Sequence, residues 1–188
     1  MGQNKRDDII EYTIDLISKY GYEGFSYQDL SNNFGITKAT VHHYFPRKED
    51  LGLAICDHYV GFLNDFEAEA AELAEPLDKI EAYRNKERGC MTSEMVCPFF
   101  ALLADIKVLP ESMQQRLREL AQQELDLLAA IFEDGRQQGQ FGFEGPAATI
   151  AVLFVSAMRG SLSYARVINS DLSRATLDSF MALLTTRA

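Results

Sequence analysis

The sequence predicts an all-α protein with about nine helices, in which a three-helix N-terminal head is joined through a long fourth helix to a C-terminal helical bundle. Apolar residues recur at spacings of three and four along most of the 188-residue chain. No segment shows the apolar–polar alternation of a half-buried strand, and glycine or proline stands where most helices are expected to end. Hydrophobic residues make up 47% of the chain, which is enough to bury a core and excludes a disordered protein.

The first two helices of the head are defined by their ends. An apolar face of isoleucines at helical spacing begins at Ile9, and Gly21 ends that helix. Ser26 and Asp29, three residues apart, form the capping-box pattern that opens a second helix. Gly35 ends this second helix after about two turns.

The third helix is expected to follow at once, with Thr37 as its N-cap. At about 100° per residue, Val41 and Phe45 share a face that packs inward, whereas Ala39 and His43 point away from it. Two short helices joined by a Gly-containing turn, after a longer helix that forms their hydrophobic floor, are a helix-turn-helix arrangement. The sequence therefore predicts a helix-turn-helix head.

The rest of the chain predicts a helical body. We expect a helix-turn-helix head over 1–47 and a helical body over 48–188. The clearest linker in the body is the segment 134–146, which is rich in glycine. The helices expected in the body cover residues 47–74, 77–89, 96–108, 110–133, 147–167 and 172–184.

The net charge is the main obstacle to nucleic-acid binding. The chain carries 18 basic and 28 acidic residues, a formal charge of −10 at pH 7. Through Asp50 the balance is six basic against eight acidic residues, so the head is closer to neutral than the body. DNA affinity is therefore expected to depend on a few well-placed cations and on dimerisation, and to fall steeply with salt.

Enzymes, metal proteins and membrane proteins are not expected. The sequence has no Gly-rich phosphate loop and no nucleophile with a base in reach. His42, His43 and His58 cannot converge on one metal ion, because neighbouring helix residues diverge by about 100°, and no cofactor is implied. No leader and no apolar run near the roughly 20 residues of a membrane span are visible. Three cysteines without framework spacing suit the reducing cytoplasm, where we expect the protein.

The segment GYEGFSYQDLSNNFGITKATVHHYFPRKEDLGLAI, which begins at Gly21, resembles the N-terminal signature of the TetR family of bacterial transcriptional regulators. The matching features are the Tyr-Gly turn, the FSYQDLSNNFGIT segment, the TVHHYF core and the Lys-Glu-Asp-Leu that begins the fourth helix. One departure is the pair Val41-His42, where a hydrophobic–Tyr pair is commonest in the family. The resemblance implies a repressor that binds an inverted-repeat operator as a homodimer and is released by a small-molecule effector. It makes residues 1–47 the DNA-binding domain and residues 48–188 the effector-binding and dimerisation domain.

Double-stranded DNA is thus the expected partner, with the third helix in its major groove. Lys38 suits guanine and Ala39 leaves room for a thymine methyl, but the histidines either donate or accept, so their base preference stays open. The residues expected at base edges are Thr37, Lys38, Ala39, His42 and His43. By resemblance, the residues that hold phosphates are Ser26, Tyr27, Thr40, Tyr44 and Lys48. Lys5 and Arg6 are expected either to extend these contacts as an N-terminal arm or to be disordered.

The last two helices are expected to form the homodimer interface, because their small residues let helices approach closely. The resemblance implies a four-helix bundle between the two copies. The residues expected at this interface are Ala147, Ala148, Ala151, Val155, Ala157, Gly160, Ser161, Phe180, Leu183 and Leu184. In the alternative interpretation, some residues of these helices belong to the core of a single chain.

An effector pocket is expected among the fifth to eighth helices, where methionine and phenylalanine suit a small apolar ligand. Its expected lining is Met91, Met95, Cys97, Phe99, Phe100, Phe154, Met158 and Arg159. Arg159 either faces an anionic group of the ligand or pairs with a carboxylate, and each aromatic residue is alternatively part of the core.

Two alternative functions stay open. The acidic charge favours a helix-turn-helix-shaped protein that binds another protein without binding DNA, whereas the cations Lys38 and Lys48 argue against it. A thiol-based sensor of oxidants or electrophiles, of the same family, would use Cys90 or Cys97. On one continuous helix these two residues would lie about 10 Å apart by rise alone, too far for a disulfide.

Overall fold

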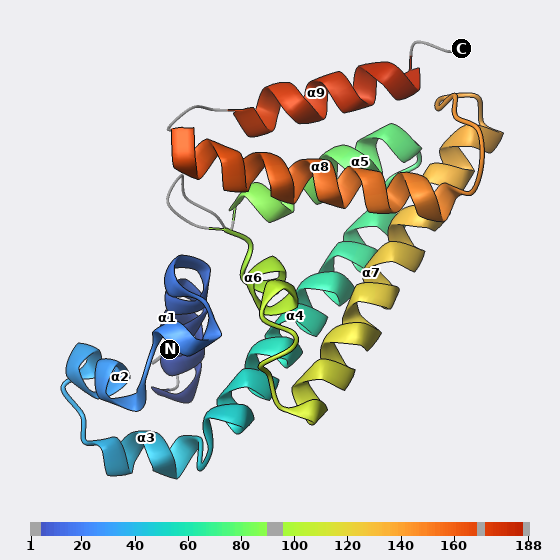
Figure 1. Ribbon diagram of the computed structural model, residues 1–188. Coiled ribbons are helices and arrows are strands. Elements are labelled where there is room, and N and C mark those ends of the chain that lie inside the picture. The colour runs from blue at the N-terminus through green and yellow to red at the C-terminus, as the bar shows by residue number, and fades with distance from the viewer. Residues whose placement is uncertain (1–4, 90–95, 169–171, 186–188) are drawn as a thin grey trace. The chain divides into compact units, whose positions relative to one another are not determined.

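The computed structural model describes residues 5–89, 96–168 and 172–185. Within these ranges the chain forms nine α-helices and one 3₁₀ turn and contains no strand, which confirms the all-α prediction (Figure 1). The elements are α1 (Lys5–Tyr20), η1 (Tyr22–Gly24), α2 (Tyr27–Phe34), α3 (Lys38–Tyr44), α4 (Lys48–Ala71), α5 (Pro76–Gly89), α6 (Pro98–Ala104), α7 (Glu111–Gln137), α8 (Ala147–Ile168) and α9 (Leu172–Thr185).

Three helices differ in extent from the sequence prediction by several residues. The helix α6 is shorter than the predicted 96–108, because Pro98 takes its first position and the Val96 N–H donates instead to the Ser18 carbonyl at 3.2 Å. At the other end α4 stops at Ala71, before the predicted 74. The helix α7 continues to Gln137 and so includes the first residues of the predicted linker.

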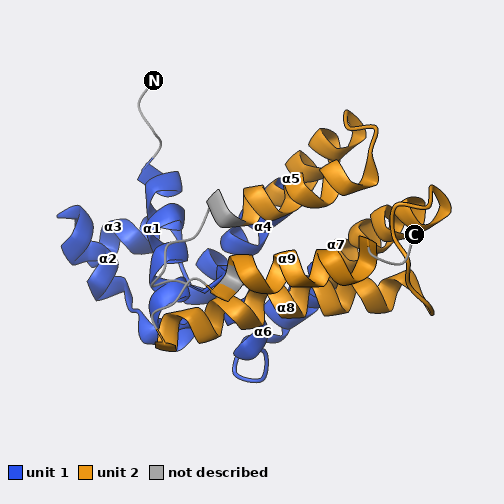
Figure 2. Ribbon diagram, turned by 90° about the horizontal axis from the view of Figure 1, so that it is seen from above, with its two compact units in different colours: residues 1–61, 95–120 blue, residues 62–94, 121–188 orange. Residues whose placement is uncertain are grey.

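The chain divides into two compact units (Figure 2). Unit 1 comprises residues 1–61 and 95–120, and unit 2 comprises residues 62–94 and 121–188. Both α4 and α7 contribute residues to each unit. These units are defined by compactness. The predicted boundary after residue 47 separates functions instead, and it stays a prediction.

The core of unit 1 holds the head together. Ile9 and Ile17 of α1, Leu30 of α2 and Val41 of α3 are all fully buried. Each has the helical spacing that the sequence predicts, so α1 forms the floor beneath α2 and α3. At the C-terminal side of α1, the Tyr22 N–H donates to Asp105, just after α6, at 3.0 Å.

Lys5 and Arg6 are ordered, so the disordered alternative for these two cations is wrong. Lys5 and Arg6 belong to the first turn of α1. The Lys5 ammonium lies 4.9 Å from the centre of the Phe34 ring, and the Arg6 guanidinium lies 5.1 Å from that of Phe45. The two side chains therefore cover aromatic rings of α2 and of the segment after α3, and their contact with the DNA backbone stays a prediction.

The core of unit 2 is aromatic. Phe66 of α4 lies 5.0 Å from Tyr83 of α5, between ring centres, and Phe132 of α7 lies 5.6 Å from Phe154 of α8. Phe141, which follows α7, packs against Phe132 at 5.7 Å. The Phe141 ring also packs against Gly135 of α7. A Cβ at this position would overlap the ring, so only glycine fits there.

By length and composition, α8 is the one described helix that could cross a membrane. The sequence prediction missed it because Thr149 and Ser156 interrupt its apolar run. Its inward residues Phe154 and Met158 belong to the core of unit 2, and the buried Arg159 makes ion pairs there. These contacts are those of a core helix.

Candidate functional sites

The helix α2 begins with the capping box that the sequence predicts. The Asp29 carboxylate accepts hydrogen bonds from the Ser26 N–H at 2.7 Å and from the Ser26 hydroxyl at 2.8 Å. These bonds, the hydroxyl first, lower the pKa of Asp29. Because Ser26 gives its hydroxyl hydrogen to Asp29, donation to a phosphate would require this hydroxyl to turn.

The helix α3 exposes the residues expected at base edges. Thr37 caps it by accepting from the Thr40 N–H at 3.1 Å. Val41 and Phe45 are buried at 0% and 1% exposure, as their spacing predicts. The N-cap Thr37 is exposed, and so are Lys38, Ala39, His42 and His43 of the helix itself. Their contact with DNA stays a prediction, because exposure permits such a contact without proving it.

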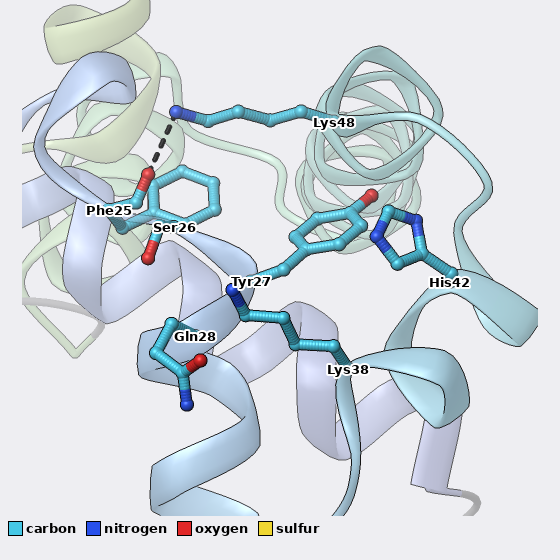
Figure 3. A pocket seen from close by; sticks show the side chains of 7 residues that line it. All are labelled: Phe25, Ser26, Tyr27, Gln28, Lys38, His42 and Lys48. Carbon is cyan, nitrogen blue, oxygen red and sulfur yellow. Dashed lines mark hydrogen bonds between the residues drawn. The ribbon is translucent and has the colours of Figure 1, made fainter.

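A hollow of about 330 Å³ lies beside α3 on the same unit (Figure 3). It brings together five of the predicted DNA-binding residues, from α3 and from the starts of α2 and α4, and it adds two residues that the sequence analysis missed. The side chains that line it are Phe25, Ser26, Tyr27, Gln28, Lys38, His42 and Lys48. Phe25 and Gln28 were missed, although they belong to the FSYQDLSNNFGIT segment, because neither carries a charge that would suggest contact with a phosphate.

Lys48 joins the start of α4 to the start of α2. Its ammonium donates to the Phe25 carbonyl at 2.9 Å and lies 4.3 Å and 4.6 Å from the ring centres of Phe25 and Tyr22. Partial burial lowers the pKa of Lys48. This cation therefore has a structural role in the head in addition to any contact with phosphate.

Tyr27 and His42 form the far wall of the hollow. The Tyr27 hydroxyl donates to the Phe45 carbonyl at 2.8 Å, and burial raises the pKa of Tyr27 to about 12. The ring centres of Tyr27 and His42 are 4.7 Å apart with the planes at 65°. Nδ1 of His42 lies 3.2 Å from the Pro46 carbonyl oxygen. The imidazole is thus held on two sides. Tyr44, which was also predicted to hold a phosphate, is half-buried, and its ring lies beside that of His43.

Glu49 and Asp50, at the start of α4, both form ion pairs with the neighbouring Arg47. The Arg47 guanidinium donates to Asp50 at 2.7 Å and lies 2.9 Å from Glu49. The bond from Arg47 lowers the pKa of Asp50. Arg47 therefore offsets part of the negative charge that an incoming phosphate meets here.

In unit 2, Arg159 lies in a buried ion-pair network. Its guanidinium donates to Glu124 at 2.8 Å and 2.5 Å and to Glu87 at 3.0 Å. Tyr83 donates to Glu124 and lies 3.3 Å from Glu87. These four residues are at most 3% exposed. Of the two expectations for Arg159, pairing with a carboxylate is therefore the one observed.

The other predicted effector residues are divided between the two units. Phe154 and Met158 belong to the core of unit 2. Cys97 and Phe99 are buried in unit 1, where the Phe99 ring stacks on Tyr59 at 4.2 Å, and Phe100 is half-buried. Met91, Met95 and Cys90 lie outside the described residues. Cys97 is 2% exposed at the start of α6, so an oxidant in solvent does not reach it in this conformation.

The helices α8 and α9 carry an exposed apolar face that only partly matches the predicted interface. Ala151, Val155, Ser161 and Leu184 are buried within the unit, as the alternative interpretation expects for some residues of these helices. Which residues meet a second copy stays a prediction. Ala147, Ala157, Gly160 and Phe180 are partly buried, whereas Ala148 and Leu183 are exposed. The face also includes large residues that the prediction missed, namely Val152, Leu153, Tyr164, Val167 and Ile168.

Comparison with known families gives two matches along the chain. The family model described as "Bacterial regulatory proteins, tetR family" matches residues 9–55, which include α2, α3 and the start of α4. A second model, described as "Tetracyclin repressor-like, C-terminal domain", matches residues 76–180. Together they cover the head and most of the body.

Individual relatives agree with these matches. A crystal structure of a TetR family transcriptional regulator from Agrobacterium tumefaciens is 30% identical, with a TM-score of 0.89 over 96% of this chain and 97% of that one. The transcriptional repressor NicS of Pseudomonas putida is 26% identical over 95% of this chain and 81% of its own length. The structure of AibR in complex with isovaleryl coenzyme A and operator DNA is 20% identical, with a TM-score of 0.72 over 97% of this chain and 98% of that one.

Proposed function

This chain belongs to the TetR family of bacterial regulatory proteins, and from that premise we propose that it is a repressor that binds an inverted-repeat operator as a homodimer. It is a helix-turn-helix transcriptional regulator and not an enzyme. Binding of a small-molecule effector in the body releases the operator. As a bacterial regulator of transcription, it acts in the cytoplasm, where the DNA is.

The observation that carries the proposal is the exposed face of α3 beside the cationic hollow. Lys38, His42 and His43 stand on a helix whose other face is fixed by the buried Val41. A helix with a rigid base and polar side chains on its outer face suits the major groove, where base edges offer distinct donors and acceptors. Lys48 supplies a second cation at the edge, where a backbone phosphate would lie.

Dimerisation is supported by the apolar face of α8 and α9. Val152, Leu153 and Leu183 are 44%, 51% and 73% exposed among the residues that the structure describes. Large exposed apolar patches mark interaction sites. A second copy of this chain would cover the same face on both subunits, as two-fold symmetry requires.

Release by an effector is supported by the relatives and by the core of unit 2. NicS is named a repressor, and AibR was solved with an acyl coenzyme A and operator DNA. In this chain the network around Arg159 supplies buried polar groups within an otherwise apolar core. A ligand that binds one conformation of this core more tightly than the other shifts the equilibrium between the two states.

The test is selection of duplexes from a random pool by the purified protein at about 0.1 M salt, followed by sequencing. We expect an enriched inverted repeat whose half-sites are about one helical turn apart or a multiple of it. Enrichment of a single, asymmetric site would contradict the symmetric dimer. A failure to retain any duplex, also at lower salt, would favour the alternative in which the head binds another protein.

Two variants separate specific recognition from simple charge loss. Lys38→Ala removes a cation from the exposed face of α3, and Lys107→Ala removes an exposed cation outside that face. We expect the first variant to lose preference at particular base positions and the second to select the same site as the wild type. Equal effects of both variants would mean that α3 does not read the sequence.

A further inference from the structure

We propose that Asp105, the C-cap of α6, is a positioning residue for DNA binding, because it holds the turn η1 and η1 in turn holds the Lys48 ammonium. This inference rests on the DNA-binding function proposed above, in which Lys48 contacts the DNA backbone. The predicted DNA-binding residues lie at or before Lys48, whereas Asp105 is 83 residues from its partner Tyr22 in the sequence. A residue of the predicted body thereby affects the affinity for DNA.

The Asp105 carboxylate contacts the turn that follows α1. It accepts a hydrogen bond from the Tyr22 N–H at 3.0 Å. Gly21, the residue before Tyr22, has a left-handed backbone with a φ of 76°, and a Cβ built there would lie 3.0 Å from the same carboxylate oxygen. The chain therefore passes so close to Asp105 that a side chain at position 21 would push the carboxylate away.

Both ends of α6 are anchored within unit 1. The Val96 N–H, just before α6, donates to the Ser18 carbonyl of α1 at 3.2 Å. At the other end, the Asp105 N–H donates to the Ala101 carbonyl at 3.1 Å, which keeps Asp105 on the last turn of α6. The carboxylate that meets Tyr22 is therefore carried by a helix whose own position is fixed.

The Tyr22 ring connects η1 with the start of α4. Its centre lies 4.6 Å from the Lys48 ammonium. The ring is 3% exposed and packs against α4 one turn further on, where a Cβ at Gly52 would lie 3.2 Å from it. The Phe25 ring meets the Tyr22 ring edge to face at 6.1 Å between centres, and its own centre lies 4.3 Å from the same ammonium. Two buried rings therefore hold the cation at distances typical of cation–π contacts.

A hydrogen bond also fixes the Lys48 ammonium at the edge of the hollow. The ammonium donates to the Phe25 carbonyl at 2.9 Å, as Figure 3 shows. An ammonium carries three hydrogens, so this bond leaves it able to donate to a phosphate as well. Lysine is otherwise flexible, and a flexible side chain must be ordered when it binds. Holding Lys48 in place before DNA arrives therefore raises the affinity by roughly two- to tenfold per head.

Charge alone predicts the opposite effect of Asp105. An acidic residue repels DNA, so the loss of its charge should strengthen binding. The contacts of Asp105 predict instead that its removal weakens binding, because η1 and the Tyr22 ring lose their anchor. The sign of the change therefore distinguishes a positioning residue from an acidic residue that acts by its charge.

The experiment measures binding of the intact protein to the duplex enriched by selection, by fluorescence anisotropy at about 0.1 M salt. Asp105→Ala removes the acceptor, and we expect its affinity to fall by roughly two- to tenfold per head. Asp105→Asn loses the charge but keeps an oxygen that accepts from the Tyr22 N–H, so it should bind as tightly as the wild type or more tightly. Asp57→Ala, which removes an exposed acidic residue of the same unit, should do the same.

A double-mutant cycle identifies the residue through which Asp105 acts. Lys48→Met keeps an apolar side chain beside the two rings and removes the ammonium. Asp105→Ala should weaken binding when Lys48 is present and should not weaken it further in Lys48→Met. A general loss of folding would weaken binding in both backgrounds alike, so equal weakening in both would overturn the inference.

Gly21→Ala disturbs the same contact without removing the carboxylate, and it decides the question if Asp105→Ala does not fold. The new Cβ would displace Asp105, so we expect weaker binding, again only when Lys48 is present. Gly139→Ala is the matched control, because Gly139 has a similar left-handed backbone, with a φ of 74°, and open space around a Cβ. Gly139→Ala should bind DNA as the wild type does.

The outcomes distinguish the inference from the function on which it rests. Unchanged or tighter binding by either Asp105→Ala or Gly21→Ala would overturn the inference and leave DNA binding standing. Weakening of the same size in Asp57→Ala or Gly139→Ala would have the same consequence, because the effect would then not depend on the contact with η1. Failure of the wild type to bind any duplex, also at low salt, would overturn the proposed function itself.

Discussion

Replacing Arg159 with methionine tests the energetic role of the buried network in unit 2. Methionine keeps much of the length of the arginine stem but removes the guanidinium, which is 3% exposed. The substitution leaves Glu124 and Glu87, at 2% and 3% exposure, without the cation that donates to both. Two buried carboxylates without a cation are strongly unfavourable, so we expect a large loss of stability.

The size of this loss follows from the burial of the ion pairs, and we compare it with the loss expected for an exposed ion pair. Removing one partner of a buried ion pair costs about 3–5 kcal/mol, a large share of the roughly 5–15 kcal/mol by which a domain is stable. Arg116 makes the same chemical contact at the surface, 3.0 Å from Asp57, with side-chain exposures of 37% and 68%. Such exposed pairs contribute about 0–1 kcal/mol. Arg159→Met should therefore be about 2 kcal/mol or more less stable than Arg116→Met.

The assay is urea unfolding followed by far-ultraviolet circular dichroism, at equal protein concentration because dimerisation affects apparent stability. If the free energies of unfolding of the two variants agree to within about 1 kcal/mol, the argument from burial is wrong. A further variant checks the cause. Adding Glu87→Gln and Glu124→Gln to Arg159→Met removes the uncompensated charges and should recover part of the loss. A further loss of similar size would mean that lost packing, and not buried charge, destabilises the single variant.

Three other substitutions test the packing, the head and the dimer face. Gly135→Ala should lower the free energy of unfolding by about 1–3 kcal/mol, because the added Cβ meets the Phe141 ring. Gly61→Ala has open space around its Cβ and should raise the free energy of unfolding by about 0.5–1 kcal/mol. A change of the same sign in both variants would refute the packing argument. Lys48→Met should reduce the salt slope of DNA binding by about one per head, and an unchanged slope would remove this residue from the phosphate contacts. Leu183→Glu should yield monomers in sedimentation, while Val108→Glu, also exposed, should remain dimeric; a dimeric Leu183→Glu would exclude this face as the interface.

The sequence by itself determined the head because its signals act over a few residues. Ser26 with Asp29, and Thr37 with Thr40, are hydrogen-bonded pairs three residues apart, so their spacing alone predicts where α2 and α3 begin. Val41 is buried because helical periodicity places it on the inner face. Helix ends were predicted less accurately where a distant partner competes for the backbone. The helix α6 was expected to begin at Val96, but the Val96 N–H donates to the carbonyl of Ser18 on α1, and α6 begins at Pro98.

The tertiary structure decided every feature that depends on partners far apart in the chain. Arg159 is 35 residues from Glu124 and 72 from Glu87, and nothing local in the sequence distinguishes this pairing from an anionic ligand. The Phe25 carbonyl that holds Lys48 is 23 residues away and belongs to the backbone, which carries no sequence signal. Small residues on α8 indicate that helices approach closely but not which helix approaches, since the same apolar stripe serves a core or an interface. The periodicity of apolar residues indicates that one face of a helix is covered. Which other helix covers that face depends on the path of the chain.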